Sequence, residues 1–158
     1  PVDGRIDLRI RSNPGFRAPE DERPMVLIGN GTGIAGLRAL LKARIASGRF
    51  RNWLLFGERS AAHDFHYGDE ILAWQSSGWI ERIDLAFSRD GAERTYVQHL
   101  LRDRLPQLRE WLHAGAAVYV CGSLEGMAPA VDAVLREAIG IETLEAMALN
   151  GRYRRDVY

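Results

Sequence analysis

The stretch PMVLIGNGTGIAG (24–36) decides the fold class of this chain. Its apolar start ends at glycines, as buried parallel strands do, and predicts a strand over residues 24–29. The GNGTG turn (29–33) follows at once, because glycine allows a sharp reversal at low steric cost. Apolar residues then recur at spacings of three and four, which predicts an amphipathic helix over residues 34–46. A strand, a glycine turn and a helix in this order are typical of an α/β fold.

The same alternation continues to the end of the chain. Further strands are predicted over residues 52–57, 79–88, 116–122 and 153–158, and helices over 64–77, 96–114, 123–140 and 142–149. Pro106 lies inside 96–114, so that helix should break near 103–105 and restart at the proline. Ser123 is the expected N-cap of the helix that ends near Gly140. The pattern predicts an α/β fold with three layers, a doubly wound, parallel, five-stranded sheet between helices.

Composition excludes several classes of function. The chain has 158 residues and a formal net charge of zero, so one domain is expected, with no nucleic-acid partner and no membrane contact. Cys121 is the single cysteine, which rules out an internal disulfide and argues against a cysteine-based metal site. His63 and His66 have the spacing H-x-x-H, but an exposed loop is the favoured interpretation. No metal is expected.

The glycine turn predicts a site for an anion. The start of helix 34–46 leaves backbone N–H groups unpaired, and such helix starts attract phosphate. Thr32 adds a hydroxyl beside Gly31 and Gly33. The dinucleotide pattern G-x-G-x-x-G appears only when counted from Gly31, and Glu58 would be its acidic residue, later than usual. A turn of the type GxGxG also occurs at S-adenosylmethionine sites, and a tight turn without a ligand is the third alternative.

A second phosphate could be bound at the segment AFSRDGAERTYVQ (86–98). Ligands of doubly wound sheets bind at the carboxyl ends of strands, where Ser88 and Arg89 are expected. Arg94, Tyr96 and Gln98 alternate, so their side chains share one side if this segment is extended. Two arginine–phosphate bonds would contribute roughly 3–6 kcal/mol, enough to select NADPH over NADH by about a hundredfold or more. The alternative is a solvated, charged loop.

Five motifs in this order resemble one family. They are GNGTGIAGL (29–37), LLFGERSAAHDFHYGDEIL (54–72), AFSRDGAERTYVQHLL (86–101), VYVCGSLEGMA (118–128) and RYRRDVY (152–158). Together they resemble the Rossmann-like NADP-binding domain of the diflavin reductases, which is of the ferredoxin–NADP reductase type. The resemblance covers residues 15–158, and the RYRRDVY ending is similar to that of the bacterial sulfite reductase flavoprotein subunits.

The resemblance implies a role for each matching residue. Three groups are implied in coenzyme binding: Gly31, Thr32 and Gly33 for the pyrophosphate; Ser88, Arg89, Arg94, Tyr96 and Gln98 for the adenosine 2′-phosphate pocket; and Arg59, Gly122 and Met127 as further contacts. Cys121 would lie beside the nicotinamide, with the Asp156 carboxylate near it. Tyr158, the last residue, would stack on the flavin ring. Three positions depart from the family pattern, namely Gly36, Ser123 and Ala130.

The resemblance also implies a division of the chain. Residues 1–23 are expected to hold the last strand of a FAD-binding barrel, over residues 5–11, and a linker. Residues 24–158 are expected to form the NADP-binding domain. The rest of the FAD-binding domain would belong to the same parent chain, with FMN as a further candidate cofactor there. The electron acceptor is left open, and the cytoplasm is the expected compartment.

The leading functional hypothesis is the NADPH-binding module of a diflavin-type oxidoreductase. It would present NADPH for hydride transfer to FAD on the neighbouring domain, and this chain alone would be inactive. A non-catalytic NADP(H)-sensing domain is the first alternative; it would need no flavin, so Tyr158→Ala should leave its output intact. An S-adenosylmethionine-dependent methyltransferase is the second, but Ile28 stands where an acidic residue would be expected.

Overall fold

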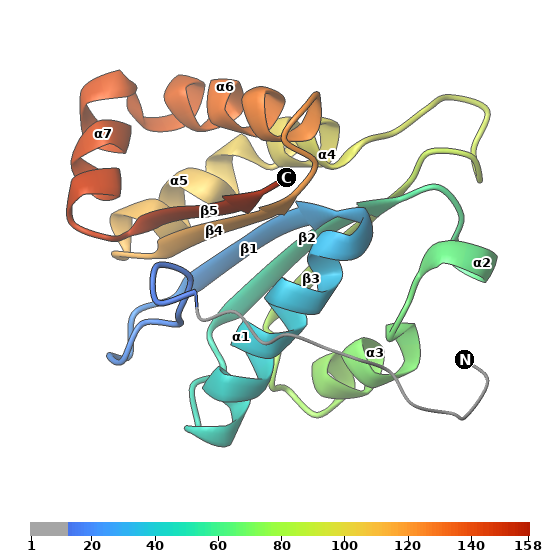
Figure 1. The fold of residues 1–158 in the computed structure, drawn as a ribbon, viewed down its shortest axis with the longest axis horizontal. Coiled ribbons are helices and arrows are strands. Elements are labelled where there is room, and N and C mark those ends of the chain that lie inside the picture. The colour runs from blue at the N-terminus through green and yellow to red at the C-terminus, as the bar shows by residue number, and fades with distance from the viewer. Residues whose placement is uncertain (1–12) are drawn as a thin grey trace, which may run out of the picture.

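A five-stranded parallel sheet forms the centre of the molecule (Figure 1). The computed structural model describes residues 13–158, so the strand expected over 5–11 lies outside the described residues. The strands are β1 (Met25–Asn30), β2 (Asn52–Glu58), β3 (Arg82–Phe87), β4 (Ala117–Gly122) and β5 (Tyr153–Val157). Their order in the sheet is β3-β2-β1-β4-β5. From β1 the chain adds β2 and β3 on one side and then crosses to β4 on the other side, so the strand order reverses between β1 and β4. Ligands of such sheets bind at that point, beyond the carboxyl ends of the strands.

Helices cover both faces of the sheet, as Figure 1 shows. The helices are α1 (Ile34–Ala46), α3 (Gly68–Ser76), α4 (Val97–Asp103), α5 (Leu105–His113), α6 (Met127–Ile139) and α7 (Ile141–Leu149), with two short ones, η1 (Gly31–Gly33) and α2 (Ala61–Asp64). Residues of α1 and α3 pack on one face, and residues of α4 to α7 pack on the other. The predicted three-layer α/β architecture is confirmed.

Burial on both faces explains the continuous apolar runs of the central strands. In β1, Val26 and Ile28 pack in the core under α4 to α7, while Met25 and Leu27 pack in the core under α1 and α3. All four side chains are fully buried. A strand that faces solvent on one side would instead alternate apolar with polar residues. The uninterrupted apolar run in the sequence therefore indicates a central strand that helices cover on both faces.

The break predicted near Pro106 is confirmed, because α4 ends at Asp103 and α5 begins at Leu105 with the proline in its first turn. The single helix predicted over 64–77 is wrong. The chain forms α2 and α3 instead, and Tyr67 between them has a left-handed backbone with φ of 62°. This break turns Phe65 towards Phe56 and Phe87, with ring centroids 6.2 Å and 5.7 Å away.

Ser123 does not cap the helix that follows β4. Helix α6 begins only at Met127, after Gly126 with φ of 81°. The Ser123 backbone N–H donates to Asn30 Oδ1 at 2.9 Å, which fastens this residue to the end of β1. Its hydroxyl donates to the Glu125 carbonyl within the loop. These two bonds accompany a loop that continues to Gly126 and is longer than predicted.

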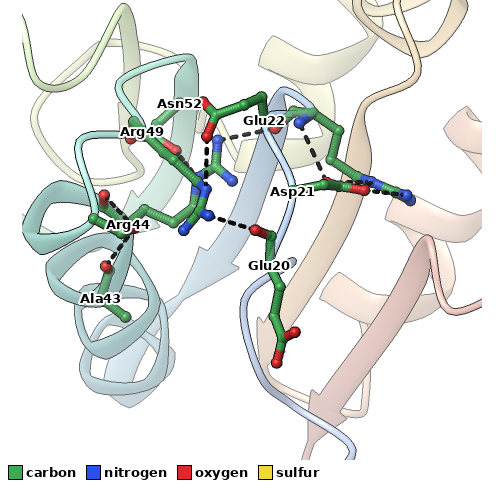
Figure 2. Close-up of polar contacts among 9 residues, drawn as sticks. Glu20, Asp21, Glu22, Ala43, Arg44, Arg49 and Asn52 are labelled. Carbon is green, nitrogen blue, oxygen red and sulfur yellow. Dashed lines mark hydrogen bonds and ion pairs between the residues drawn. The ribbon is translucent and has the colours of Figure 1, made fainter.

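At the amino edge of the sheet, two arginines hold the segment that leads into β1 (Figure 2). Arg44 of α1 is buried; its Nε donates to Asn52 Oδ1 at 2.6 Å and its Nη2 to the Arg23 carbonyl at 2.9 Å. Burial and the neighbouring Arg49 charge lower the pKa of Arg44. Arg49 donates to Glu22 Oε1 at 3.2 Å. These contacts fix the start of β1.

Candidate functional site

The glycine turn packs directly on the backbone of β4. Gly31 has φ of +56°, a conformation that favours glycine. A Cβ on Gly33 would lie 2.2 Å from the Cys121 carbonyl oxygen, and one on Gly29 would lie 2.4 Å from the same atom. Only hydrogen fits at these two positions. The turn therefore places the start of α1 where the strand order reverses, between β1 and β4.

A cavity of about 720 Å³ opens at the carboxyl edge of the sheet, beside this turn. Most of the predicted coenzyme-binding residues line it, namely Gly31, Thr32, Arg59, Ser88, Arg89, Arg94, Tyr96, Gln98 and Met127. They come from the loops after β1, β2, β3 and β4. Residues far apart in the sequence thus surround one space whose volume is in the range of small-molecule sites, roughly 300–1,000 Å³.

Five predicted residues lie outside the lining of this cavity: Gly33, Cys121, Gly122, Asp156 and Tyr158. Gly33 and Gly122 are packed into the turn. A Cβ on Gly122, whose φ is +132°, would lie 2.3 Å from Asn30 Oδ1. The other three residues belong to the β4–β5 side of the sheet.

Three arginines contribute positive charge to the lining of the cavity. Arg59, Arg89 and Arg94 are exposed, and within residues 13–158 none of them lies within 4.0 Å of a carboxylate in an ion pair. The acidic side chains nearby are bonded to backbone instead. Glu58 accepts from the Arg59 N–H at 2.8 Å, and Asp64 accepts from the Ser60 N–H at 3.0 Å. The guanidinium groups are therefore available to an anionic ligand.

The segment that leads into α4 is extended only as far as Tyr96. Tyr96 has φ of −115° and ψ of 163°, and its backbone N–H donates to His99 Nδ1 at 3.3 Å. Helix α4 begins at Val97, so Gln98 lies in its first turn, within the helix predicted over 96–114, and the condition that this segment is extended through Gln98 is not met. Arg94, Tyr96 and Gln98 nevertheless line the same cavity. The first turn of α4 therefore brings Gln98 to the cavity, where an extended segment with alternating side chains would otherwise be needed.

Cys121 is buried at the carboxyl end of β4, opposite Asp156 of β5 in the strand register. Burial, helped by the Asp156 charge, raises the pKa of the Cys121 thiol to about 11. The thiol is therefore protonated at neutral pH, which makes it a poor nucleophile. A Cβ on Gly36 would lie 3.0 Å from Sγ, so the glycine at this position leaves room beside the sulfur.

The raised pKa of Cys121 predicts a measurable loss of stability in alkali. In the unfolded chain the thiol ionises near its ordinary pKa of 9.0, whereas in the folded chain it stays protonated until about pH 11. The protonated Cys121 thiol therefore makes its full contribution to the free energy of unfolding below pH 9. This contribution decreases as the pH rises and is smaller by about 1.4 kcal/mol at pH 10. Urea unfolding of the parent and of Cys121→Ala at pH 7.5 and pH 10 checks this. The difference in unfolding free energy between the two proteins should fall by that amount; an unchanged difference contradicts it.

The chain ends at the same edge of the sheet. The Tyr158 N–H donates to the Gly122 carbonyl at 3.1 Å, and the Leu124 N–H donates to the Tyr158 carbonyl at 3.0 Å. The Tyr158 hydroxyl lies 2.8 Å from Thr32 Oγ1 of the glycine turn, while the side chain remains well exposed. The terminal ring is thus fixed close to the predicted pyrophosphate site.

Residues 27–133 match the family model of the oxidoreductase NAD-binding domain. The chain belongs to this family. Relatives of this NAD-binding domain include the sulfite reductase [NADPH] flavoprotein alpha-components of Neisseria meningitidis FAM18, 40% identical over 168 residues, and of Yersinia enterocolitica, 41% identical over 169 residues. Each alignment covers 99% of this chain and 28% of the relative. The chain thus spans just over a quarter of the length of these relatives.

The sequence missed several residues of the NAD-binding domain's cavity, among them Asn30, Asp64 and Glu125. Asn30 stands between two glycines of the turn, which was a usable signal. Glu125 belongs to the loop that was predicted as helix. Within residues 13–158 no group of three or more His, Cys, Asp and Glu side chains could hold a metal ion. Over the same range, no helix has the length and apolar character needed to cross a membrane.

Proposed function

We propose that this NAD-binding domain binds NADPH and presents it for hydride transfer to a FAD held by another domain of the same longer chain. The observation that supports it most is the position of Arg59, Arg89 and Arg94, which have no carboxylate in ion-pair range within residues 13–158. They line the cavity from the segments after β2 and β3, and the glycine turn lines it from the segment after β1. A dinucleotide that carries a pyrophosphate and a 2′-phosphate complements both sets of residues.

The cavity residues fit the adenosine half of the coenzyme. Gly31, Thr32 and Gly33 would receive the pyrophosphate, because the positive φ of Gly31 and the start of α1 present N–H donors. Ser88, Arg89 and Arg94 would bind the 2′-phosphate. Tyr96 and Gln98 would contact the adenine, with Arg59 and Met127 on the walls of the same cavity. This assignment gives the pyrophosphate neutral N–H donors and the 2′-phosphate charged guanidinium donors.

The β4–β5 edge would receive the nicotinamide. When bound, NADPH supplies a hydride, and the chain's own residues set its surroundings. Cys121 offers a protonated thiol, Asp156 a carboxylate opposite it in the register, and Gly122 backbone close to both. Tyr158 would stack on the flavin and would have to yield this place to the nicotinamide. Gly36 leaves space beside Sγ on the helix side.

The parent protein is inferred from the relatives. This chain corresponds to 28% of their length, so other domains occupy the rest of those chains. We propose that residues 1–23 are the end of a FAD-binding barrel and its linker, that residues 24–158 are the NADP-binding domain, and that FMN is bound further upstream. The relatives are flavoprotein alpha-components of sulfite reductase by name, and the same acceptor is proposed here. The cytoplasm is the proposed compartment.

Isothermal titration calorimetry of this chain with NADP⁺, NAD⁺ and S-adenosylmethionine tests the proposal. NADP⁺ should bind about a hundredfold or more tighter than NAD⁺, because two arginines contribute roughly 3 kcal/mol or more to the 2′-phosphate. S-adenosylmethionine should not bind. Equal or negligible binding of the two dinucleotides, or binding of S-adenosylmethionine alone, would overturn it.

Tyr158→Phe should make the pyrophosphate site easier to occupy. The variant removes the hydroxyl that lies 2.8 Å from Thr32 Oγ1 but keeps the ring, so Thr32 is free to turn to the ligand. Because an exposed hydrogen bond contributes at most about 1 kcal/mol net, NADP⁺ should bind about two- to fivefold tighter, by calorimetry. Exposed Tyr67, at the start of α3, provides the control Tyr67→Phe. Equal affinities of the two variants would contradict the expectation.

A further inference from the structure

Asp90 joins two turns that are far apart in the sequence. It follows Arg89 in the turn after β3, and its side chain is exposed. Asp90 Oδ2 accepts a hydrogen bond of 2.7 Å from the backbone N–H of Ala61, the first residue of α2, where the turn after β2 ends. A carboxylate acceptor makes this bond stronger than one between neutral groups. The bond is therefore a candidate for fixing one turn against the other.

Two backbone hydrogen bonds lie beside it. The last register pair of β2 and β3 is Glu58 with Phe87. Beyond that pair, the Ser88 N–H donates to the Glu58 carbonyl at 2.9 Å, and the Arg89 N–H donates to the Arg59 carbonyl at 2.8 Å. The ladder thus extends past both strands and sets the backbone of Arg59 next to that of Arg89. The Asp90–Ala61 bond closes this extension at its outer end.

The turn after β2 has three consecutive N–H groups bonded to carboxylates. Those of Arg59 and Ser60 are bonded by Glu58 and Asp64, which belong to the same local segment. The third, that of Ala61, is bonded by Asp90 from the turn after β3. Of the three carboxylates, Asp90 alone connects the turn to a different strand. Its loss would free the outer end of the turn that carries Arg59.

We propose that Asp90 is a positioning residue for the 2′-phosphate site. It holds the turns after β2 and β3 together, so that Ser88 and Arg89, which would bind the 2′-phosphate, stay beside Arg59 on the cavity wall. This inference rests on the proposed function, because it assigns a phosphate to the cavity. It also accounts for a carboxylate within a basic site: Asp90 repels the ligand through its charge but acts through its bond to the backbone. The two effects have opposite signs and can be separated.

The variants Asp90→Asn and Asp90→Ala separate the effect of the Asp90 charge on the ligand from the effect of its bond to the backbone. Asparagine removes the charge and keeps an oxygen that can accept from the Ala61 N–H, whereas alanine removes both. The readout is the affinity ratio of 2′,5′-ADP to 5′-AMP, measured by calorimetry on the full chain. The Asp90→Asn ratio should equal or exceed that of the parent, because a repelling charge is lost. The Asp90→Ala ratio should fall by up to about tenfold below that of Asp90→Asn, because alanine also loses the neutral bond to the Ala61 N–H, which is worth roughly 0.5–1.5 kcal/mol.

Failure of the inference and failure of the proposed function give different results. If the parent itself binds both nucleotides equally, the proposed function fails. If the parent prefers 2′,5′-ADP but both variants change the ratio alike, Asp90 acts through charge alone and the inference is overturned. If Asp90→Ala weakens the binding of both nucleotides equally and lowers the melting temperature more than Asp90→Asn does, the bond between Asp90 and Ala61 is purely structural. That result also overturns the inference.

Discussion

The double variant Arg89→Gln/Arg94→Gln should bind NADP⁺ about a hundredfold to ten-thousandfold more weakly than the parent, with NAD⁺ affinity unchanged. Both side chains line the cavity, and within residues 13–158 neither has a carboxylate in ion-pair range. Each guanidinium would contribute roughly 1.5–3 kcal/mol to the 2′-phosphate, a group that NAD⁺ lacks. Calorimetry with both dinucleotides measures the effect.

Arg102→Gln is the matched control. Arg102 lies on the exposed surface of α4 and donates to Glu137 at 3.2 Å, outside the cavity. A surface ion pair of this kind contributes little, about 1 kcal/mol at most, and removing it should leave both affinities as they are. If the double variant weakened NADP⁺ and NAD⁺ by the same factor, the two arginines would not contact a 2′-phosphate.

Gly33→Ala should lower the free energy of unfolding by about 3 kcal/mol or more. The added Cβ would lie 2.2 Å from the carbonyl oxygen of Cys121, 2.6 Å from its carbonyl carbon and 2.9 Å from the Gly122 nitrogen. All three are backbone atoms of β4, so no side chain can turn away to make room. The glycine turn and β4 must separate, and this also removes the phosphate site. Urea unfolding and NADP⁺ titration measure the two losses.

Gly91→Ala provides the comparison for the glycine turn. A Cβ at Gly91 would meet its nearest atom, the Glu93 carbonyl oxygen, at 3.5 Å, which is an ordinary contact. Its stability should stay within about 0.5 kcal/mol of the parent. A Gly33→Ala protein as stable as Gly91→Ala would show that the turn does not pack on β4 as described.

Local sequence signals predicted the parts of the fold that depend on local chemistry. The glycine turn follows from an apolar run that ends at Gly29, and the break between α4 and α5 follows from Pro106. The break at Tyr67 could not be predicted in the same way, because its positive φ occurs at a residue that rarely adopts one. Packing of Phe65 against Phe56 and Phe87 accompanies that break, and no local pattern encodes it.

In the candidate site, too, features encoded by the local sequence were predicted, and contacts between distant segments were not. Ser88 and Arg89 were predicted because they end a strand, and the structure brings them to the cavity together with Arg59. Ser123 had the chemistry of an N-cap, but the bond from its N–H to Asn30 joins two strands that are distant in the sequence. The roles of these residues in coenzyme binding stay predictions.

The most direct test is a crystal structure of this chain with NADP⁺. The 2′-phosphate should lie within hydrogen-bond distance of Ser88 and Arg89, and the pyrophosphate against the turn of residues 31–33. An adenosine end bound anywhere else, or a 2′-phosphate that points into solvent, would contradict the proposed function.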